Sequence, residues 1–241
     1  MVSISVVTCT NDPDGYGEMK DSFLRFAGLS EEIEFIPIRS ARSMSAGYNE
    51  GMKAARGEWL IFCHDDIRIV QSDSKGLSSA FEAFDVFGVC GTKRCQSSNW
   101  YYSDSNDLLG RVVIPGRSAS EPDLLEVFSP LTGNCSAQAL DGIFIASRSE
   151  IARNVRFSEE IEGFTCYDID FTYRCHLNGH KVGVSSAVLL KHYSKVETFS
   201  SEKIDGWRRN QEALSLKFAF HRSFDDKIRH HTVPFDREIG D

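Results

Sequence analysis

The sequence contains no hydrophobic run near the about 18 apolar residues that a membrane-spanning helix needs. Its first residues also lack the charged segment and long apolar stretch of a signal peptide, and they are more typical of a first strand. We therefore expect a cytoplasmic protein with no transmembrane segment and at most a peripheral contact with a membrane. Internal repeats and low-complexity segments are absent as well.

Paired cysteines and an excess of basic charge are also missing. The seven cysteines are odd in number, scattered and without a CxxC pair, which is typical of reduced thiols rather than of a disulfide framework or a zinc site. A net charge of −8 argues against a nucleic-acid partner. With 241 residues, 41% of them hydrophobic and 26% charged, the chain can form one large α/β domain, with or without a tail.

Strand-like and helix-like segments alternate in the first half, which predicts βαβ units and a parallel sheet. Strands are expected at residues 4–8, 33–38, 59–63 and 86–90, and helices at 18–27, 46–56 and 77–84. Further along, strands are expected at 139–146, 182–184 and 187–191, and helices at 168–177 and 203–220. The polar and aromatic residues 92–135 predict a long loop or hairpin region, and the last twenty residues an arm or a frayed tail.

The most informative feature is the apolar run 59–63, which ends abruptly in His64, Asp65 and Asp66. Ligands of open α/β sheets collect beyond the carboxyl ends of strands. Three side chains able to bind metal at such an end indicate a divalent cation, and a cation in a groove indicates a phosphorylated substrate. The alternative is a solvated turn, because Asp is common after strands.

Four motifs in order resemble the family 2 glycosyltransferases with the GT-A fold. The motifs are Thr8-Cys9-Thr10 with Asn49-x-Gly51, Ala55-x-Gly57 and Asp65-Asp66; Leu140-Asp141-Gly142; Phe157-Ser158-Glu159-Glu160; and Tyr167-Asp168-Ile169-Asp170 with Leu177-x-Gly179. The resemblance covers about residues 1–193. It implies an α/β protein with a mostly parallel central sheet flanked by helices, followed by a C-terminal helix and tail. The GT-A domain would span 1–200, with a donor half (1–91) and an acceptor half (92–200), and 201–241 would form the helix and tail.

The resemblance also implies residue roles. The candidates on the metal, which would be Mn²⁺ or Mg²⁺, are Asp66, His64 and His192, where the alternative for His192 is a structural histidine. The candidates on the nucleotide are Thr8, Cys9, Thr10, Asn49 and Asp65. Asp141 and Gly142 would border the sugar or acceptor, with a plain strand and turn as the alternative, and the aromatic Trp100 and the acid Asp170 are further candidates near the sugar or acceptor. Two positions depart from the family pattern, because His64 stands where a carboxylate is usual and Tyr167 where a Glu is usual. His64 can therefore bind metal, contact ribose or phosphate, or shape the pocket, while imidazole ligands favour Mn²⁺.

Asp168 is the expected general base, because transfer to a hydroxyl needs a carboxylate that accepts its proton. The alternative is an ordinary helix cap, which Asp168 or Asp170 can supply. The aromatic residues Trp100, Tyr101 and Tyr102 can stack on a sugar or pack against the body of the protein. Trp207 is expected to anchor the C-terminal helix to the core.

These features predict a metal-dependent, inverting glycosyltransferase that uses a UDP, GDP or dTDP sugar and a glycan, lipid-linked or other hydroxyl acceptor. Residues 38–40 lack the acidic residue found in many uridine-using relatives, which leaves the base open. A degenerate GT-A fold that only binds sugar or nucleotide is the alternative. A pyrophosphorylase would carry a Gly-rich, Arg-containing loop after the first strand, which residues 8–17 lack. The charges at Arg208, Arg209 and 227–231 form a solvated face or approach an anionic lipid-linked acceptor.

Overall fold

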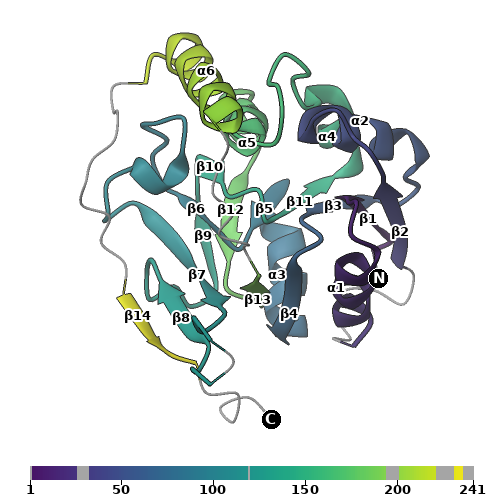
Figure 1. Ribbon diagram of the computed structural model, residues 1–241, viewed down its shortest axis with the longest axis vertical. Helices are drawn as coiled ribbons and strands as arrows, with labels where there is room; N and C mark the ends of the chain where they lie inside the picture. The colour runs from purple at the N-terminus through teal and green to yellow at the C-terminus, as the bar shows by residue number, and fades with distance from the viewer. Residues whose placement is uncertain (1, 26–32, 119, 194–200, 221–230, 236–241) are drawn as a thin grey trace.

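The structure is a computed structural model that describes residues 2–25, 33–118, 120–193, 201–220 and 231–235 (Figure 1). Its first sheet has the strand order β2-β1-β3-β11-β5-β12-β9. The strands are β1 (Ile4–Cys9), β2 (Ile33–Ile38), β3 (Trp59–Cys63), β5 (Val86–Gly88), β9 (Asn134–Ser136), β11 (Phe144–Arg148) and β12 (Val182–Ser185).

The second sheet has the order β10-β6-β7-β13-β4, and β8 and β14 extend it beside β7. Its strands are β4 (Ile67–Ser72), β6 (Cys90–Thr92), β7 (Leu108–Ile114), β8 (Leu124–Val127), β10 (Ala139–Leu140), β13 (Val188–His192) and β14 (His231–Pro234). The helices are α1 (Pro13–Arg25), α2 (Met44–Ala54), α3 (Ser74–Ala83), α4 (Ser149–Val155), α5 (Tyr167–Leu177) and α6 (Ser201–Phe218), with a short 3₁₀ turn, η1 (Trp100–Tyr102). None of these helices is long and apolar enough to cross a membrane.

The α/β expectation is confirmed, and the first strands lie where the sequence places them, whereas α1 begins at Pro13, five residues before the helix predicted at 18–27. β1 pairs in parallel with both β2 and β3. Helix α2 packs so closely on β1 at Gly51 that a Cβ there would lie only 2.2 Å from Val7 Cγ1. The strands β2, β1, β3, β5 and β12 of the first sheet run in the same direction, as a mostly parallel sheet predicts. The exceptions are β11, which runs antiparallel between β3 and β5, and β9, which runs antiparallel to β12.

Two expected strands are each divided between the two sheets. The segment 86–90 forms β5 in the first sheet and opens β6 in the second, and the segment 139–146 is broken at Asp141 and Gly142 into β10 and β11. The apolar pattern continues across both breaks because the residues on either side are buried. The second break is important for function, since it turns Asp141 and Gly142 away from regular pairing.

Strand β4 and helix α4 were not predicted, and residues 92–135 contain β7 and β8 as an antiparallel pair, as the hairpin alternative anticipated. Of the two alternatives for the tail, an arm or a frayed end, the arm agrees with residues 231–234, which form β14 and pair with β8. The residues 227–230 of the predicted basic patch lie outside the described part of the chain. All seven cysteines are free, as expected.

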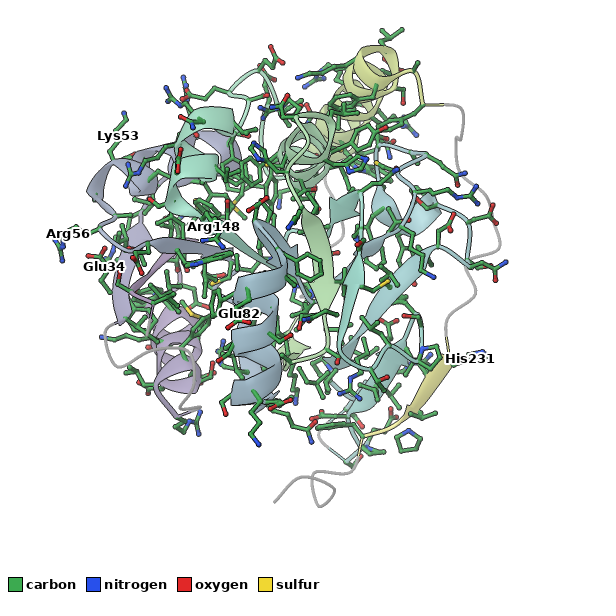
Figure 2. The ribbon with its side chains drawn as sticks, turned by 180° about the vertical axis from the view of Figure 1, so that it is seen from behind. Glu34, Lys53, Arg56, Glu82, Arg148 and His231 are labelled. Atoms are coloured by element: carbon green, nitrogen blue, oxygen red, sulfur yellow. The ribbon has the colours of Figure 1, made fainter. Side chains whose placement is uncertain are left out.

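The core lies between the helices and the first sheet. Trp59, Phe62 and Phe171 are among its fully buried side chains, and Phe157 stacks on Phe171 at 4.2 Å between ring centroids. Arg148, labelled in Figure 2, packs on this core, with its guanidinium 5.0 Å from the centre of the Trp59 ring. Helix α6 lies beside α5 (Figure 1), and Trp207 packs against the core as expected.

Candidate active site

Two segments far apart in sequence bring a His–Asp–His cluster together. His64, Asp65 and Asp66 form the turn between the buried strand β3 and β4, and His192 is the last residue of β13. Because β13 pairs antiparallel with β4, His192 lies opposite Ile67 and therefore beside Asp66. Asp66 Oδ1 is 3.4 Å from His192 Nε2 and 3.7 Å from His64 Nδ1. One ligand atom from each residue lies within 4.8 Å of the others.

The chemistry of this cluster fits a divalent cation. Asp66 Oδ1 is buried and has no hydrogen bond of acceptable geometry. Burial alone would raise the pKa of Asp66, but His192 and His64 outweigh it and hold the pKa below its ordinary value. One carboxylate oxygen and two imidazole nitrogens form a ligand set that suits Mn²⁺ and later transition ions better than Mg²⁺.

The Asp168 carboxylate lies in the first turn of α5 and also bonds outside that helix. The cap position of α5 is Cys166, which makes no side-chain cap hydrogen bond. Asp168 Oδ2 instead accepts a 3.0 Å hydrogen bond from the N–H of Gly142. Burial and the charge of Asp141 raise the pKa of Asp168 to about 7. A carboxylate with this pKa can take up a proton near neutral pH.

A cavity of about 380 Å³ joins these residues to an aromatic wall. Trp100 Nε1 donates a 2.6 Å hydrogen bond to Asp141 Oδ2, and Ile143 N donates to Asp141 Oδ1 at 2.8 Å. The sequence-predicted residues that line this cavity are His64, Trp100, Asp141, Gly142, Asp168 and His192, and Trp207 lines it too. The structure thus gathers the predicted base and most of the predicted acceptor residues in one place.

A second cavity of about 260 Å³ borders the same cluster. It is lined by the predicted residues Cys9, Thr10, His64, Asp65 and Asp66, together with Asn11, Ser40, Ala41, Met44 and Phe164. His64 and Phe164 line both cavities, so the two spaces adjoin at the His–Asp–His cluster.

Residues 5–212 match the model of a family described as "Glycosyltransferase like family". The chain belongs to this family. Among curated proteins, this family member is 23% identical over 206 residues to "ATP synthase subunits region ORF 6" of Fuscovulum blasticum, a match that covers 79% of this chain and 75% of the relative.

Two solved structures show that this glycosyltransferase-like protein has the GT-A fold. A mannosyltransferase from Pyrobaculum calidifontis in complex with GDP-Man and Mn²⁺ has 12% identity and a TM-score of 0.57, and the match covers 95% of this chain. GalNAc-T7 with UDP, GalNAc and Mn²⁺ has 10% identity and a TM-score of 0.55, and the match covers 88% of this chain. The chain spans only 66% and 48% of these two proteins.

Three predicted site residues of this family member are not brought to either cavity. Thr8 is fully buried, and its hydroxyl lies 3.4 Å from Cys63 Sγ, because alternate residues of β1 face opposite ways. Asn49 is buried and bonded through both side-chain atoms to the backbone of Phe157, at 2.8 and 3.0 Å. It therefore ties α2 to the segment before α5.

Asp170 is the third residue, and the structure places it in a buried ion-pair cluster instead of beside an acceptor. It is 0% exposed and lies 2.7 Å from Arg174 and 2.8 Å from Lys217 of α6. It follows Asp168 by two residues, which is about 200° around a helix, so the two carboxylates face opposite ways. Asp170 joins α5 to α6.

Several residues that line the cavities were not predicted from the sequence. Asn11 and Ser40 follow the neighbouring parallel strands β1 and β2, and Ser40 N donates to Asn11 Oδ1 at 2.9 Å. Polar residues just after two such strands were the available signal. Phe164 is 55% exposed and carried no signal at all. Tyr167, read only as a departure from the family pattern, contacts His64: its hydroxyl lies 2.7 Å from His64 Nε2.

Proposed function

We propose that this protein is a metal-dependent, inverting glycosyltransferase that moves a sugar from a nucleoside-diphosphate donor to an acceptor hydroxyl. The main support for this proposal is the position of the His64–Asp66–His192 cluster. At this cluster, a cavity lined by residues at the end of β1 adjoins a second cavity that is lined by Asp168. Two substrates placed in the two cavities would meet beside the cluster.

The smaller cavity is proposed to hold the nucleotide. Among the described residues that line it there is no Lys or Arg, so a bound diphosphate needs another source of positive charge. When bound, a divalent cation would balance the negative charge that develops on the leaving diphosphate. His64, Asp66 and His192 would hold it, and the two imidazoles favour Mn²⁺ over Mg²⁺. The GDP-Man and UDP complexes of the two structural neighbours support a nucleotide donor, and UDP, GDP and dTDP all stay candidates.

Asp168 is proposed to be the general base. As the acceptor oxygen bonds to the anomeric carbon, the bond from that carbon to the diphosphate oxygen breaks on the opposite face, and the acceptor proton passes to Asp168. A single displacement of this kind inverts the anomeric centre. The Gly142 N–H would hold the carboxylate in place, and a pKa of about 7 suits a base that works near neutral pH. The cytoplasm is the proposed compartment, which is consistent with seven free cysteines.

Calorimetric titration tests the donor side of this proposal. We expect one of UDP, GDP and dTDP to bind in the presence of Mn²⁺, and its affinity to fall strongly with EDTA or in Asp66→Ala. Asp205→Ala is the control, since Asp205 is an exposed residue of α6 that pairs with Arg208. Nucleotide binding that is equally tight without metal would overturn metal dependence. Metal-dependent binding without transfer to any acceptor would instead favour the degenerate binding module.

A further inference from the structure

The larger cavity combines an aromatic wall with negative charge. The rings of Trp100, Tyr101 and Phe128 pack edge to face, with centroids 5.0 to 5.4 Å apart. Trp100 is also fixed by its hydrogen bond to Asp141. Such a wall suits the apolar C–H face of a sugar ring, and the volume of about 380 Å³ lies within the range of small-ligand sites.

The carboxylates of Asp141 and Asp168 both line the same cavity, and its described lining includes no Lys or Arg. Ionised carboxylates accept hydrogen bonds, so they are satisfied by the hydroxyl groups of a sugar. At neutral pH a sugar carboxylate is ionised and a phosphate is mostly dianionic, so neither charged group is an effective hydrogen-bond donor to these carboxylates, and its charge would be repelled at close range. Burial and, after it, the charge of Asp141 raise the pKa of Asp168, so these two carboxylates already repel each other in this cavity.

We propose that the acceptor bound in this cavity is an uncharged sugar, held by its hydroxyls on the carboxylates and by one face on the aromatic wall, and that phosphorylated and uronic-acid sugars are excluded. The inference rests on the proposed function, because it assigns the acceptor of that same site. It removes sugars with a charged group on the accepting ring from the range of acceptors left open by the sequence.

Pairs of neutral and charged sugars that are otherwise identical test, without requiring turnover, whether the larger cavity excludes charged acceptors. Binding of the methyl glycosides of glucose, galactose and mannose would be followed by saturation-transfer NMR, each beside its 6-phosphate and its 6-carboxylate. We expect at least one neutral member to bind and its charged partners to bind at least ten times more weakly. Trp100→Ala should lower the affinity for the neutral sugar, and Asp141→Asn should reduce the difference in affinity between the neutral sugar and its charged partners. The exposed Glu121→Gln should do neither.

Equal or tighter binding of the charged partners would overturn the proposal, as would no binding of any neutral sugar by a protein that binds Mn²⁺ and nucleotide. If the wild-type protein showed no metal-dependent nucleotide binding, that separate result would count against the proposed function, and the sugar-binding measurements could still be interpreted.

A different observation concerns the hydroxyl of Tyr167, which lies between His64 and Gly142. Tyr167 is buried, its hydroxyl lies 2.7 Å from His64 Nε2, and it donates to Gly142 O at 3.3 Å. The other ring nitrogen of His64, Nδ1, is the one that faces Asp66 Oδ1. The two residues that depart from the family pattern are thus in direct contact.

This contact selects one form of the His64 ring. A hydroxyl has one proton to donate, so Tyr167, which donates to Gly142 O, accepts at its oxygen from His64 Nε2–H. A neutral imidazole with its proton on Nε2 has a free electron pair on Nδ1, which is the form that binds metal through Nδ1. We infer that Tyr167 is a positioning residue that holds His64 with Nδ1 directed to the metal.

Tyr167→Phe tests this inference through metal binding alone. In the absence of substrates, we expect its Mn²⁺ affinity to fall about 10- to 100-fold, as is usual when a partner of a metal-bound histidine is lost. We also expect the visible spectrum of the Co²⁺-loaded protein to change. Tyr173→Phe is the matched control on the same helix, where the ring packs against Phe218.

A double-mutant cycle separates positioning from general structural damage. In a His64→Ala background, Tyr167→Phe should cause no further loss of Mn²⁺ affinity, because the ring that it holds is gone. Unchanged affinity and spectrum in Tyr167→Phe would overturn the inference, and so would an equal loss with and without His64. Thermal melting of each variant confirms that the protein measured is folded.

Discussion

The carboxylate of Asp168 accepts a hydrogen bond of 3.0 Å from the backbone N–H of Gly142. This contact joins the first turn of α5 to the break between β10 and β11. The same break places Asp141 at the cavity, so two carboxylates share one space. Four expectations follow from this arrangement and from the contacts around it.

Asp168→Asn should abolish most of the turnover while leaving the nucleotide site intact. Asparagine keeps the shape of the side chain but cannot accept the acceptor proton, and positioned bases contribute about 10²- to 10⁴-fold. We expect kcat to fall by that factor and Mn²⁺-dependent nucleotide affinity to stay within about twofold. Transfer assays and calorimetry on the same preparation check both. A variant that retains wild-type turnover would remove Asp168 from the role of base.

The pH dependence of activity and of stability should have opposite signs. Activity needs ionised Asp168, so kcat/KM should rise with pH through about 7, the pKa of this group. Stability behaves differently, because the folded pKa lies above the ordinary value of 3.8. The contribution of Asp168 to stability is fully present below pH 3.8 and is lost as the pH rises through about 7. Asp168→Asn lacks this loss, so its melting temperature relative to wild type should be higher at pH 8 than at pH 5.

Asp170→Asn should act on stability and not on chemistry. Its carboxylate is fully buried and binds both Arg174 and Lys217, and removal of one partner from a buried ion pair costs about 3–5 kcal/mol. We expect a lower urea midpoint, with near-normal nucleotide and sugar binding by the folded protein. Loss of acceptor binding at unchanged stability would restore the acceptor role expected from the sequence.

The contrast between Asp168 and Asp170 shows what the sequence could and could not predict. The strand that ends at His64 was predictable, because five apolar residues stop abruptly at three polar ones. The two acids of α5 were equally visible, but which one faces the cavity depends on where the helix starts and how it is rotated. The burial of Thr8 and Asn49 likewise depends on the face each turns to its neighbours.

The breaks at residue 89 and at Asp141–Gly142 were hidden for another reason. Hydrophobic periodicity reports burial, and both sheets bury their strands, so the pattern does not change where the chain passes from one sheet to the other. Strand β4 was detectable but was missed, because Ile67-Arg68-Ile69 has the apolar–polar alternation of a half-buried strand, with Ile67 and Ile69 buried, yet the run is short and directly follows the polar residues of the site. The partnership of His64 with Tyr167 spans 103 residues, and no local pattern reports a contact of that range.

Gly142→Ala should disturb the base and the metal site together. A Cβ at this position would lie 2.2 Å from the hydroxyl oxygen of Tyr167 and 3.1 Å from Asp168 Cβ, so both side chains must move. We expect Mn²⁺ affinity and turnover to fall in parallel, whereas Asp168→Asn should lower turnover alone. Gly17→Ala is the control, because nothing lies within 4 Å of a Cβ there and alanine stabilises a helix interior by about 0.5–1 kcal/mol. If Gly142→Ala lowered turnover with unchanged Mn²⁺ affinity, Tyr167 would not link this glycine to the metal site.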